Sequence, residues 1–239
     1  MFAVALRLPA SLGEAMAGNP APAESLLRRY YRSRLEGDRA GLGSQPWYSG
    51  AYYDEWSTDA HPKNATVFTP EDVLAVSYLS VRIPGRAVAD ILHRRRDELN
   101  QALFSAVQAC EGYASLGDVP RDVTSYTGNF MALPDTAWAP FVLERKLREI
   151  DKIGVVTASK LIARKLPRIY PINDQHVKAL TGVGNQYMRP LHLTLADNPR
   201  IEQTLETVRR SAGLPVSISA LRVFDVLAWM EQTDLGRIP

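Results

Sequence analysis

The residues with the clearest capacity for chemistry lie around a short turn at Gly154, between two amphipathic segments. Apolar side chains recur at helical spacing on both sides of the turn, at Leu143, Leu147 and Ile150 before it and at Ala158, Leu161 and Ile162 after it. The pattern predicts a helical hairpin over about 143–165, with the two apolar stripes facing each other. Because glycine lacks a Cβ, Gly154 permits a sharp turn and leaves the first amides of the second helix free to bind phosphate.

The charge of this segment supports a polyanionic partner. Residues 144 to 168 hold eight basic side chains against three acidic ones, a local excess of +5. The residues that we expect to contact phosphate are Lys152, Gly154, Val155, Val156 and Thr157 in the turn, and Lys160 and Arg164 one helical turn apart on the second helix. Such a cluster beside free helix amides favours a nucleic-acid backbone. A pair of solvated helices is the alternative interpretation.

Asp174 lies 20 positions after Gly154, at the start of another predicted helix. A half-buried carboxylate can stabilise a sugar with oxocarbenium character and position or deprotonate a water molecule. The same residue is also an ordinary helix N-cap for the amides of His176 or Val177. His176 can orient the carboxylate, contact a phosphate or simply pack. Both interpretations of Asp174 stay open at this point.

A family resemblance rests on two runs, Ile153-Gly154-Val155-Val156-Thr157-Ala158 and Ile172-Asn173-Asp174-Gln175-His176-Val177. Together they resemble the helix-hairpin-helix DNA glycosylase superfamily, of which endonuclease III is the familiar member, over about residues 143–180. The whole chain is also similar to an uncharacterised bacterial family that shares the hairpin and the run 221–226. The glycosylase resemblance implies that Asp174 is catalytic and lies in a cleft between two helical lobes, one over 70–180 and the other formed by 1–69 with 181–239.

The chain departs from that superfamily at three places. Val156 occupies the position of the Schiff-base lysine of bifunctional members, so an amine nucleophile is not expected there. Lys152 replaces the first glycine of the hairpin, where the carbonyls of residues 152–155 would hold the monovalent cation found in some family members. Cys110 is the only cysteine, so no iron–sulfur cluster is expected. The histidines show no metal-ligand spacing, and no catalytic metal is expected.

The resemblance therefore predicts a monofunctional DNA glycosylase that removes a damaged or modified base, including the hypermodified bases of phage genomes, and leaves an abasic site. The base must leave the duplex and enter an aromatic or apolar pocket. Candidate walls are Trp47, Tyr48, Tyr52, Trp56, Tyr126, Trp138 and Tyr187. For each of them core packing is the alternative. Two other functions stay open: a non-catalytic helix-hairpin-helix protein that binds DNA, and a module of paired helices that binds another protein.

Helical periodicity dominates the chain, and strand-like alternation is scarce, so an all-α fold is predicted. Helices are expected at 22–36, 73–81, 84–108, 138–150, 157–165, 174–180, 199–212 and 217–233. A loop-rich segment is expected at about 112–140.

The composition is that of an ordinary globular protein. The chain has 239 residues, of which 46% are hydrophobic and 23% charged, and a net charge of +2 that does not by itself indicate nucleic-acid binding. The apolar start of the chain carries Arg7 and is a poor signal peptide, and no segment reaches the ~18 apolar residues that span a bilayer. We expect a cytoplasmic monomer whose partner is double-stranded DNA.

Overall fold

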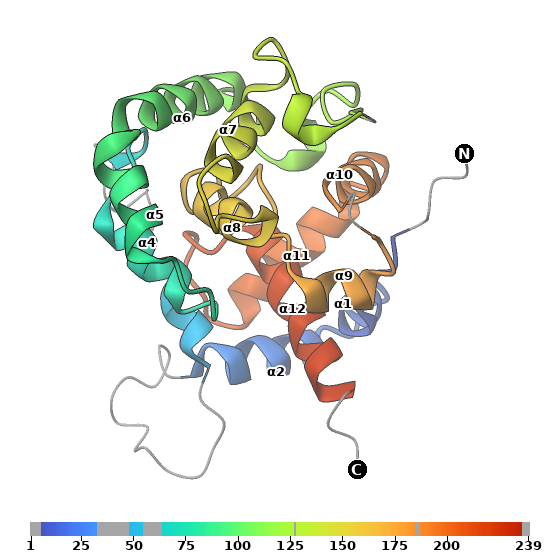
Figure 1. Cartoon of the computed structure of the whole chain (residues 1–239). Helices are drawn as coiled ribbons and strands as arrows, with labels where there is room; N and C mark the ends of the chain where they lie inside the picture. Colours follow the sequence, from blue (N-terminus) through green and yellow to red (C-terminus); the bar gives the residue numbers. More distant parts are fainter. Residues whose placement is uncertain (1–5, 33–47, 55–63, 127, 185–186, 236–239) are drawn as a thin grey trace.

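The computed structural model describes residues 6–32, 48–54, 64–126, 128–184 and 187–235. This part of the chain forms helices joined by turns and loops without a strand, which confirms the predicted all-α fold (Figure 1). The α-helices are α1 (Ala10–Met16), α2 (Ala21–Tyr30), α4 (Pro70–Ser77), α5 (Gly85–Ala89), α6 (Arg96–Cys110), α7 (Ala139–Arg148), α8 (Val155–Lys165), α9 (Gln175–Thr181), α10 (Met188–Asp197), α11 (Arg200–Ser211) and α12 (Ala220–Leu235). Short 3₁₀ segments lie at Ser49–Asp54, Leu116–Asp118 and Phe130–Ala132. Within the described residues, no helix has the length and apolar character needed to cross a membrane.

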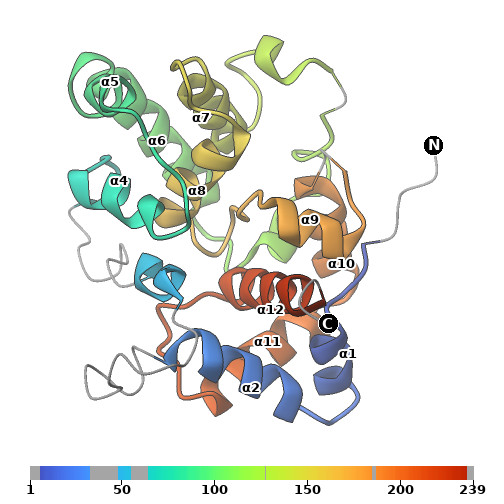
Figure 2. The same ribbon diagram turned by 60° about the horizontal axis from the view of Figure 1, so that its bottom comes forward.

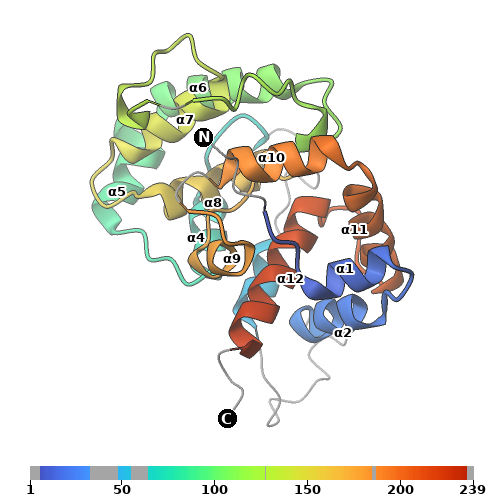
Figure 3. The same cartoon turned by 90° about the vertical axis from the view of Figure 1, so that its right-hand side faces the viewer.

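Helices from the two ends of the chain pack against each other. α1 and α2 contact α11 and α12, and Figure 2 shows them grouped on one side of the molecule. α12 also contacts α9, which lies beside it in Figure 3. One apolar core joins Leu27 on α2, Leu143 on α7, Leu161 on α8 and Leu227 on α12, all fully buried. The division into two lobes stays a prediction.

α7 and α8 form two contacting helices joined by the turn 149–154. All of the apolar residues that were predicted to face each other across this pair are buried. Lys152 adopts φ 65°, in the left-handed region that glycine enters without steric cost. The turn therefore keeps a backbone conformation suited to glycine although lysine occupies the position.

The segment 84–108 is not the single helix that was predicted. A π-helical turn follows α5 over 90–94, and Arg95 leaves the helical conformation with φ −112° and ψ 16° before α6 begins. The Arg95 guanidinium donates to the carboxylates of Glu98 on α6 and Glu149 after α7 at 2.7–3.0 Å. The helix is therefore interrupted at Arg95, the residue that connects the start of α6 to the end of α7.

The prediction of a buried helix over 73–81 is also wrong in part. α4 ends at Ser77, Ser80 adopts φ 59°, and Leu74 is 49% exposed. Residues 78–81, which follow the helix, line a pocket. Two observed helices, α1 and α10, were not predicted; Pro190 lies in the first turn of α10, where proline is tolerated.

A buried ionic contact fixes α4 against α8. The carboxylate of Asp72 accepts a hydrogen bond from the Thr69 amide at 2.8 Å, which completes a capping box at the start of α4. The same carboxylate lies 2.5 Å from the Lys165 ammonium and 3.6 Å from the Arg164 guanidinium. Basic residues of α8 are therefore part of the protein interior.

The left-handed residue of the turn gives a test of local strain. We expect Lys152→Gly to raise the free energy of unfolding by about 1 kcal/mol, because glycine lacks the Cβ that is strained at this φ. Gly182→Ala is the reciprocal control, since Gly182 has φ 72° and open space around its Cα; it should lower stability by about 1 kcal/mol. Urea unfolding measures both changes. A lower stability of Lys152→Gly contradicts the strained turn.

Candidate functional site

A pocket of about 670 Å³ lies where α8, α9, α12 and the segments 48–50 and 78–81 meet. Its lining residues are Tyr30, Tyr48, Ser49, Gly50, Tyr78, Leu79, Ser80, Val81, Val156, Lys160, Ile172, Asp174, Gln175, His176, Arg222, Asp225, Val226 and Trp229. We call it the Asp174 pocket. It brings together three of the residues singled out in the sequence near the hairpin, Val156, Lys160 and Asp174, with His176 beside them.

The two oxygens of Asp174 have different surroundings. Oδ1 accepts a hydrogen bond from the His176 amide at 2.8 Å, so Asp174 is the N-cap of α9. Oδ2 lies 3.5 Å from the Lys160 ammonium. The Asp174 side chain stays 17% exposed. The capping interpretation is thus confirmed, and the carboxylate also opens into the pocket.

Lys160 does not project from the surface as the sequence suggested. Its side chain is 4% exposed, and its Nζ donates to the Leu79 carbonyl at 3.0 Å. Burial lowers the pKa of the Lys160 ammonium, and the Asp174 carboxylate opposes that shift. Lys160 is therefore a buried cation whose Nζ contacts both the Asp174 carboxylate and the Leu79 carbonyl.

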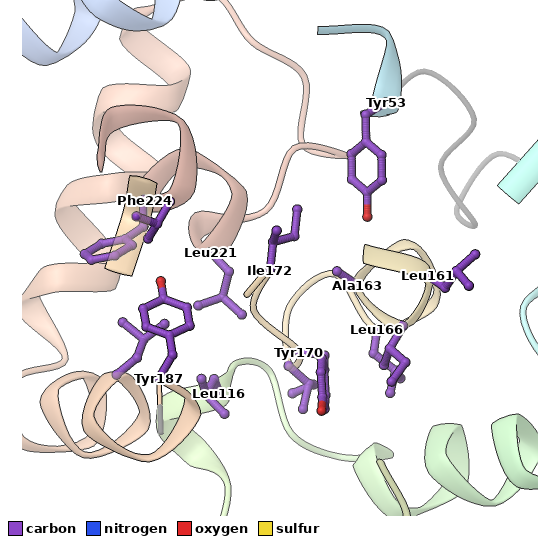
Figure 4. Packing of buried hydrophobic residues seen from close by; sticks show 14 of the residues in the cluster. Tyr53, Leu116, Leu161, Ala163, Leu166, Tyr170, Ile172, Tyr187, Leu221 and Phe224 are labelled. Carbon is purple, nitrogen blue, oxygen red and sulfur yellow. The ribbon is translucent and has the colours of Figure 1, made fainter. Parts of the chain in front are cut away.

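Arg164 likewise lies in the interior, which contradicts its predicted place on a phosphate-binding surface. Its guanidinium donates to the Tyr53 carbonyl at 2.7 Å and stacks on the Tyr53 ring. The Tyr53 hydroxyl in turn donates to the Lys160 carbonyl at 2.7 Å and points at α8 in Figure 4. α8 is enclosed by α4, α7 and these aromatic contacts, so polar residues on several of its faces are buried.

The local excess of +5 is consequently not a basic surface patch. Lys160, Arg164 and Lys165 are buried. Arg145 and Lys146 contact acids on neighbouring segments, and Arg148 pairs with Glu144 on its own helix. Lys152 and Arg168 are exposed. A charge count along the sequence could not separate these two groups, because the partners lie far away in the chain.

The turn residues that were predicted to bind phosphate have different positions. Gly154 is the exposed N-cap of α8, with no side chain near its Cα. Val156 lines the Asp174 pocket, whereas Val155 lines a second pocket together with Asn173. Thr157 is buried. The start of α8 therefore lies between two pockets.

Four residues of α12 line the pocket, and sequence analysis selected none of them as site residues: Arg222, Asp225, Val226 and Trp229. Arg222, Asp225 and Trp229 are spaced by three and four residues, so they share one face of the helix. Arg222 and Asp225 belong to the 221–226 run noted in the sequence. The available signal was the spacing, by three and four residues, of an arginine, an aspartate and a tryptophan among the apolar residues of 220–230.

Arg222 connects α12, which lines the Asp174 pocket, to the N-terminal part of the chain. Its Nε lies 3.0 and 3.2 Å from the two carboxylate oxygens of Asp54, and its Nη2 donates to the Tyr30 hydroxyl at 2.9 Å and to the Gly50 carbonyl at 3.0 Å. Its Nη1 contacts Asp225. The side chains of Arg222, Asp54 and Asp225 are each at most 10% exposed.

Asp225 is a buried acid with one unpartnered oxygen. Oδ2 receives the Arg222 contact, while Oδ1 has no hydrogen-bond partner. Burial, aided by the Asp174 charge, raises the pKa of Asp225 to about 6, although Arg222 and Lys160 oppose the shift. The pocket thus contains two carboxyl groups in different environments.

Aromatic rings form one wall of the pocket. Tyr48 stacks on Tyr30 with ring centroids 5.4 Å apart, and it meets Trp229 edge to face at 5.8 Å. His176 meets Trp229 edge to face at 6.2 Å. Tyr48 and His176 were predicted site residues, whereas Tyr30 and Trp229 were not.

The other predicted aromatic residues do not line the Asp174 pocket. Tyr126 and Tyr187 line the second pocket, of about 440 Å³, and Tyr187 belongs to the buried apolar cluster drawn in Figure 4. Trp138 contacts Phe141, and Tyr52 contacts Tyr78. Trp47 and Trp56 lie outside the described residues.

The described residues contain no group of three or more His, Cys, Asp or Glu side chains that could hold a metal ion. The monovalent cation expected at the carbonyls of residues 152–155 stays a prediction.

Comparison of the sequence with protein-family models shows which family the chain belongs to. A model described as a family of unknown function, DUF6308, matches residues 23–232. The chain belongs to this family. No curated protein and no solved structure matches the chain. The match spans Tyr30, Asp174 and Trp229, so the family region includes the whole lining of the Asp174 pocket.

The shared contacts of Arg222 predict a large effect on stability. Arg222→Lys should lower the free energy of unfolding by about 3 kcal/mol, because an ammonium cannot serve Asp54, Tyr30 and Asp225 together and leaves buried charge unpaired. Arg29→Lys, in a half-exposed pair with Asp234, is the matched control and should cost less than about 1 kcal/mol. Chemical denaturation compares the two. Equal effects contradict the structural role of Arg222.

Proposed function

We propose that this protein is a monofunctional DNA glycosylase. It hydrolyses the N-glycosidic bond of a damaged or modified base that has been extruded from duplex DNA, and it leaves an abasic site. The observation that carries the proposal is the Asp174 carboxylate, which opens into an aromatic-walled pocket next to Val156, two residues after the Gly154 turn. The resemblance of these residues to helix-hairpin-helix glycosylases supports the same assignment.

The pocket suits a flipped nucleotide in size and lining. Its volume of about 670 Å³ lies within the range of small-molecule sites. Tyr48 and Trp229 offer ring faces and edges against which a base can pack. An extruded base needs such a wall because it loses its stacking in the duplex.

Asp174 is the catalytic residue in this proposal. As the base departs, positive charge develops at C1′ of the sugar, and a nearby carboxylate stabilises it. The Lys160 ammonium at 3.5 Å and the His176 amide at 2.8 Å hold the Asp174 carboxylate in place. Asp174 can also accept a proton from the water that attacks C1′.

In this proposal the hairpin turn binds the DNA backbone. The first amides of α8 follow the exposed Gly154, and a helix of this length favours a phosphate at its N-terminus. Lys152 is exposed in the same turn. Val156 in the pocket lacks an amine, so strand cleavage through a Schiff base at that position is not proposed.

One observation favours a second candidate, a non-catalytic protein that binds DNA through the hairpin. The 2.8 Å hydrogen bond from the His176 amide gives Asp174 a complete structural role as an N-cap. In this alternative, no DNA yields abasic sites. The experiment on Asp174 separates the two candidates.

We expect Asp174→Asn to reduce base excision by at least ~100-fold while DNA binding is kept. Asparagine caps a helix about as well as aspartate, so the start of α9 should stay folded. The measurement incubates purified protein with duplexes that carry deaminated, oxidised, alkylated and hypermodified bases. Alkali then cleaves the abasic sites.

Asp97→Asn is the control for this substitution, because Asp97 is exposed on α6, away from the hairpin turn, and does not line the pocket. It should keep wild-type excision. Undiminished excision by Asp174→Asn excludes the proposed role of that carboxylate, and a complete lack of abasic sites with the wild-type protein favours the binding protein.

A further inference from the structure

A second carboxyl group shares the Asp174 pocket. Asp225 comes from α12, while Asp174 starts α9, and these two helices pack against each other (Figure 3). Asp225 lies one turn before Trp229, which belongs to the aromatic wall. A base that packs against Trp229 is therefore held next to the Asp225 side of the pocket.

The cations near the two acids are unequally distributed. Lys160 lies 3.5 Å from Asp174, whereas Arg222 is shared between Asp225 and both oxygens of Asp54. Asp225 has no cation of its own, and its Oδ1 is buried without a partner. Burying an incompletely paired carboxylate is costly, and a bound proton removes that cost.

We infer that Asp225 is the general acid of this site and donates its proton to the departing base. The inference rests on the proposed glycosylase function and adds a second catalytic residue to it. Asp174 then stabilises the positive charge on the sugar, and Asp225 protonates the departing base. Two carboxyl groups with different environments take different roles in one pocket.

The proposed step is balanced without a co-reactant other than water. The bond between C1′ and the base nitrogen breaks, and its electron pair leaves with the base, which takes the proton of Asp225. The oxygen of a water molecule bonds to C1′, and the Asp174 carboxylate accepts the proton that this water loses. Transfer of a proton from Asp174 to solvent and from solvent to Asp225 restores the site.

The groups around Asp225 determine its response to pH. It is faced by Arg222 on its own helix, Lys160 on α8, Asp174 at the start of α9, Tyr30 on α2, Tyr53 in the segment 49–54 and Tyr187 before α10. Together they leave the pKa of Asp225 at about 6. Excision of a base that needs protonation should therefore fall as the pH rises through about 6, because the proton is lost.

The test compares Asp225→Asn with the wild-type protein on the duplex panel described above. For uncharged bases, whose departure needs a proton, we expect a loss of at least ~100-fold and no fall in rate across pH 6. For a purine alkylated on the ring, which already carries a positive charge, we expect a change below about threefold. Asp225→Glu should restore part of the activity and the pH dependence.

Asp234→Asn is the matched control, because this acid lies on the same helix, pairs with Arg29 and does not line the pocket. DNA binding and thermal unfolding show whether each variant is folded. Equal losses for charged and uncharged bases, or wild-type excision by Asp225→Asn while Asp174→Asn is inactive, overturn the inference alone. If the wild-type protein itself excises only alkylated bases, the inference is overturned too. Failure of the wild-type protein on every duplex overturns the proposed function as well.

Discussion

One buried guanidinium connects the segments that line the Asp174 pocket. Arg222 on α12 contacts Asp54, the Tyr30 hydroxyl, the Gly50 carbonyl and Asp225. These partners come from three parts of the chain, so a single side chain joins the C-terminal helix to the N-terminal segment. Arginine suits this place because its fixed fork of donors serves several acceptors at once. The same contact leaves Asp225 with only a share of a positive charge, and the chemistry proposed for the pocket depends on that imbalance.

The parts of the site that the sequence predicted are those encoded by local spacing. The apolar stripes on either side of Gly154 predicted α7 and α8 within a few residues, and Asp174 was placed correctly at the start of α9. The N-cap hydrogen bond of Asp174 agrees with the capping interpretation. Its access to a pocket agrees with the catalytic interpretation. Asp225 and Trp229 were missed because nothing in the local sequence of α12 says which distant helix it packs against. That information exists only in the folded chain, where α12 meets α9.

Charge along the sequence was a poor guide to the surface. Lys160 and Arg164 have the spacing of an exposed pair, yet carbonyls of Leu79 and Tyr53 and the carboxylates of Asp174 and Asp72 take up their charges inside the protein. A buried cation is tolerated only with such partners, and here all of them lie at least 14 residues away in the chain. Lys160 consequently changes from a proposed DNA contact to a group that holds the candidate catalytic carboxylate.

We propose that the sugar of an extruded nucleotide lies beside Asp174 while the hairpin turn holds the DNA backbone. The most direct measurement is a crystal structure of the Asp174→Asn protein bound to a duplex with a reduced abasic-site analogue. The account predicts the C1′ position of the analogue in the Asp174 pocket and a phosphate on the first amides of α8, next to Gly154. DNA bound on another face, with the pocket unoccupied, would contradict it.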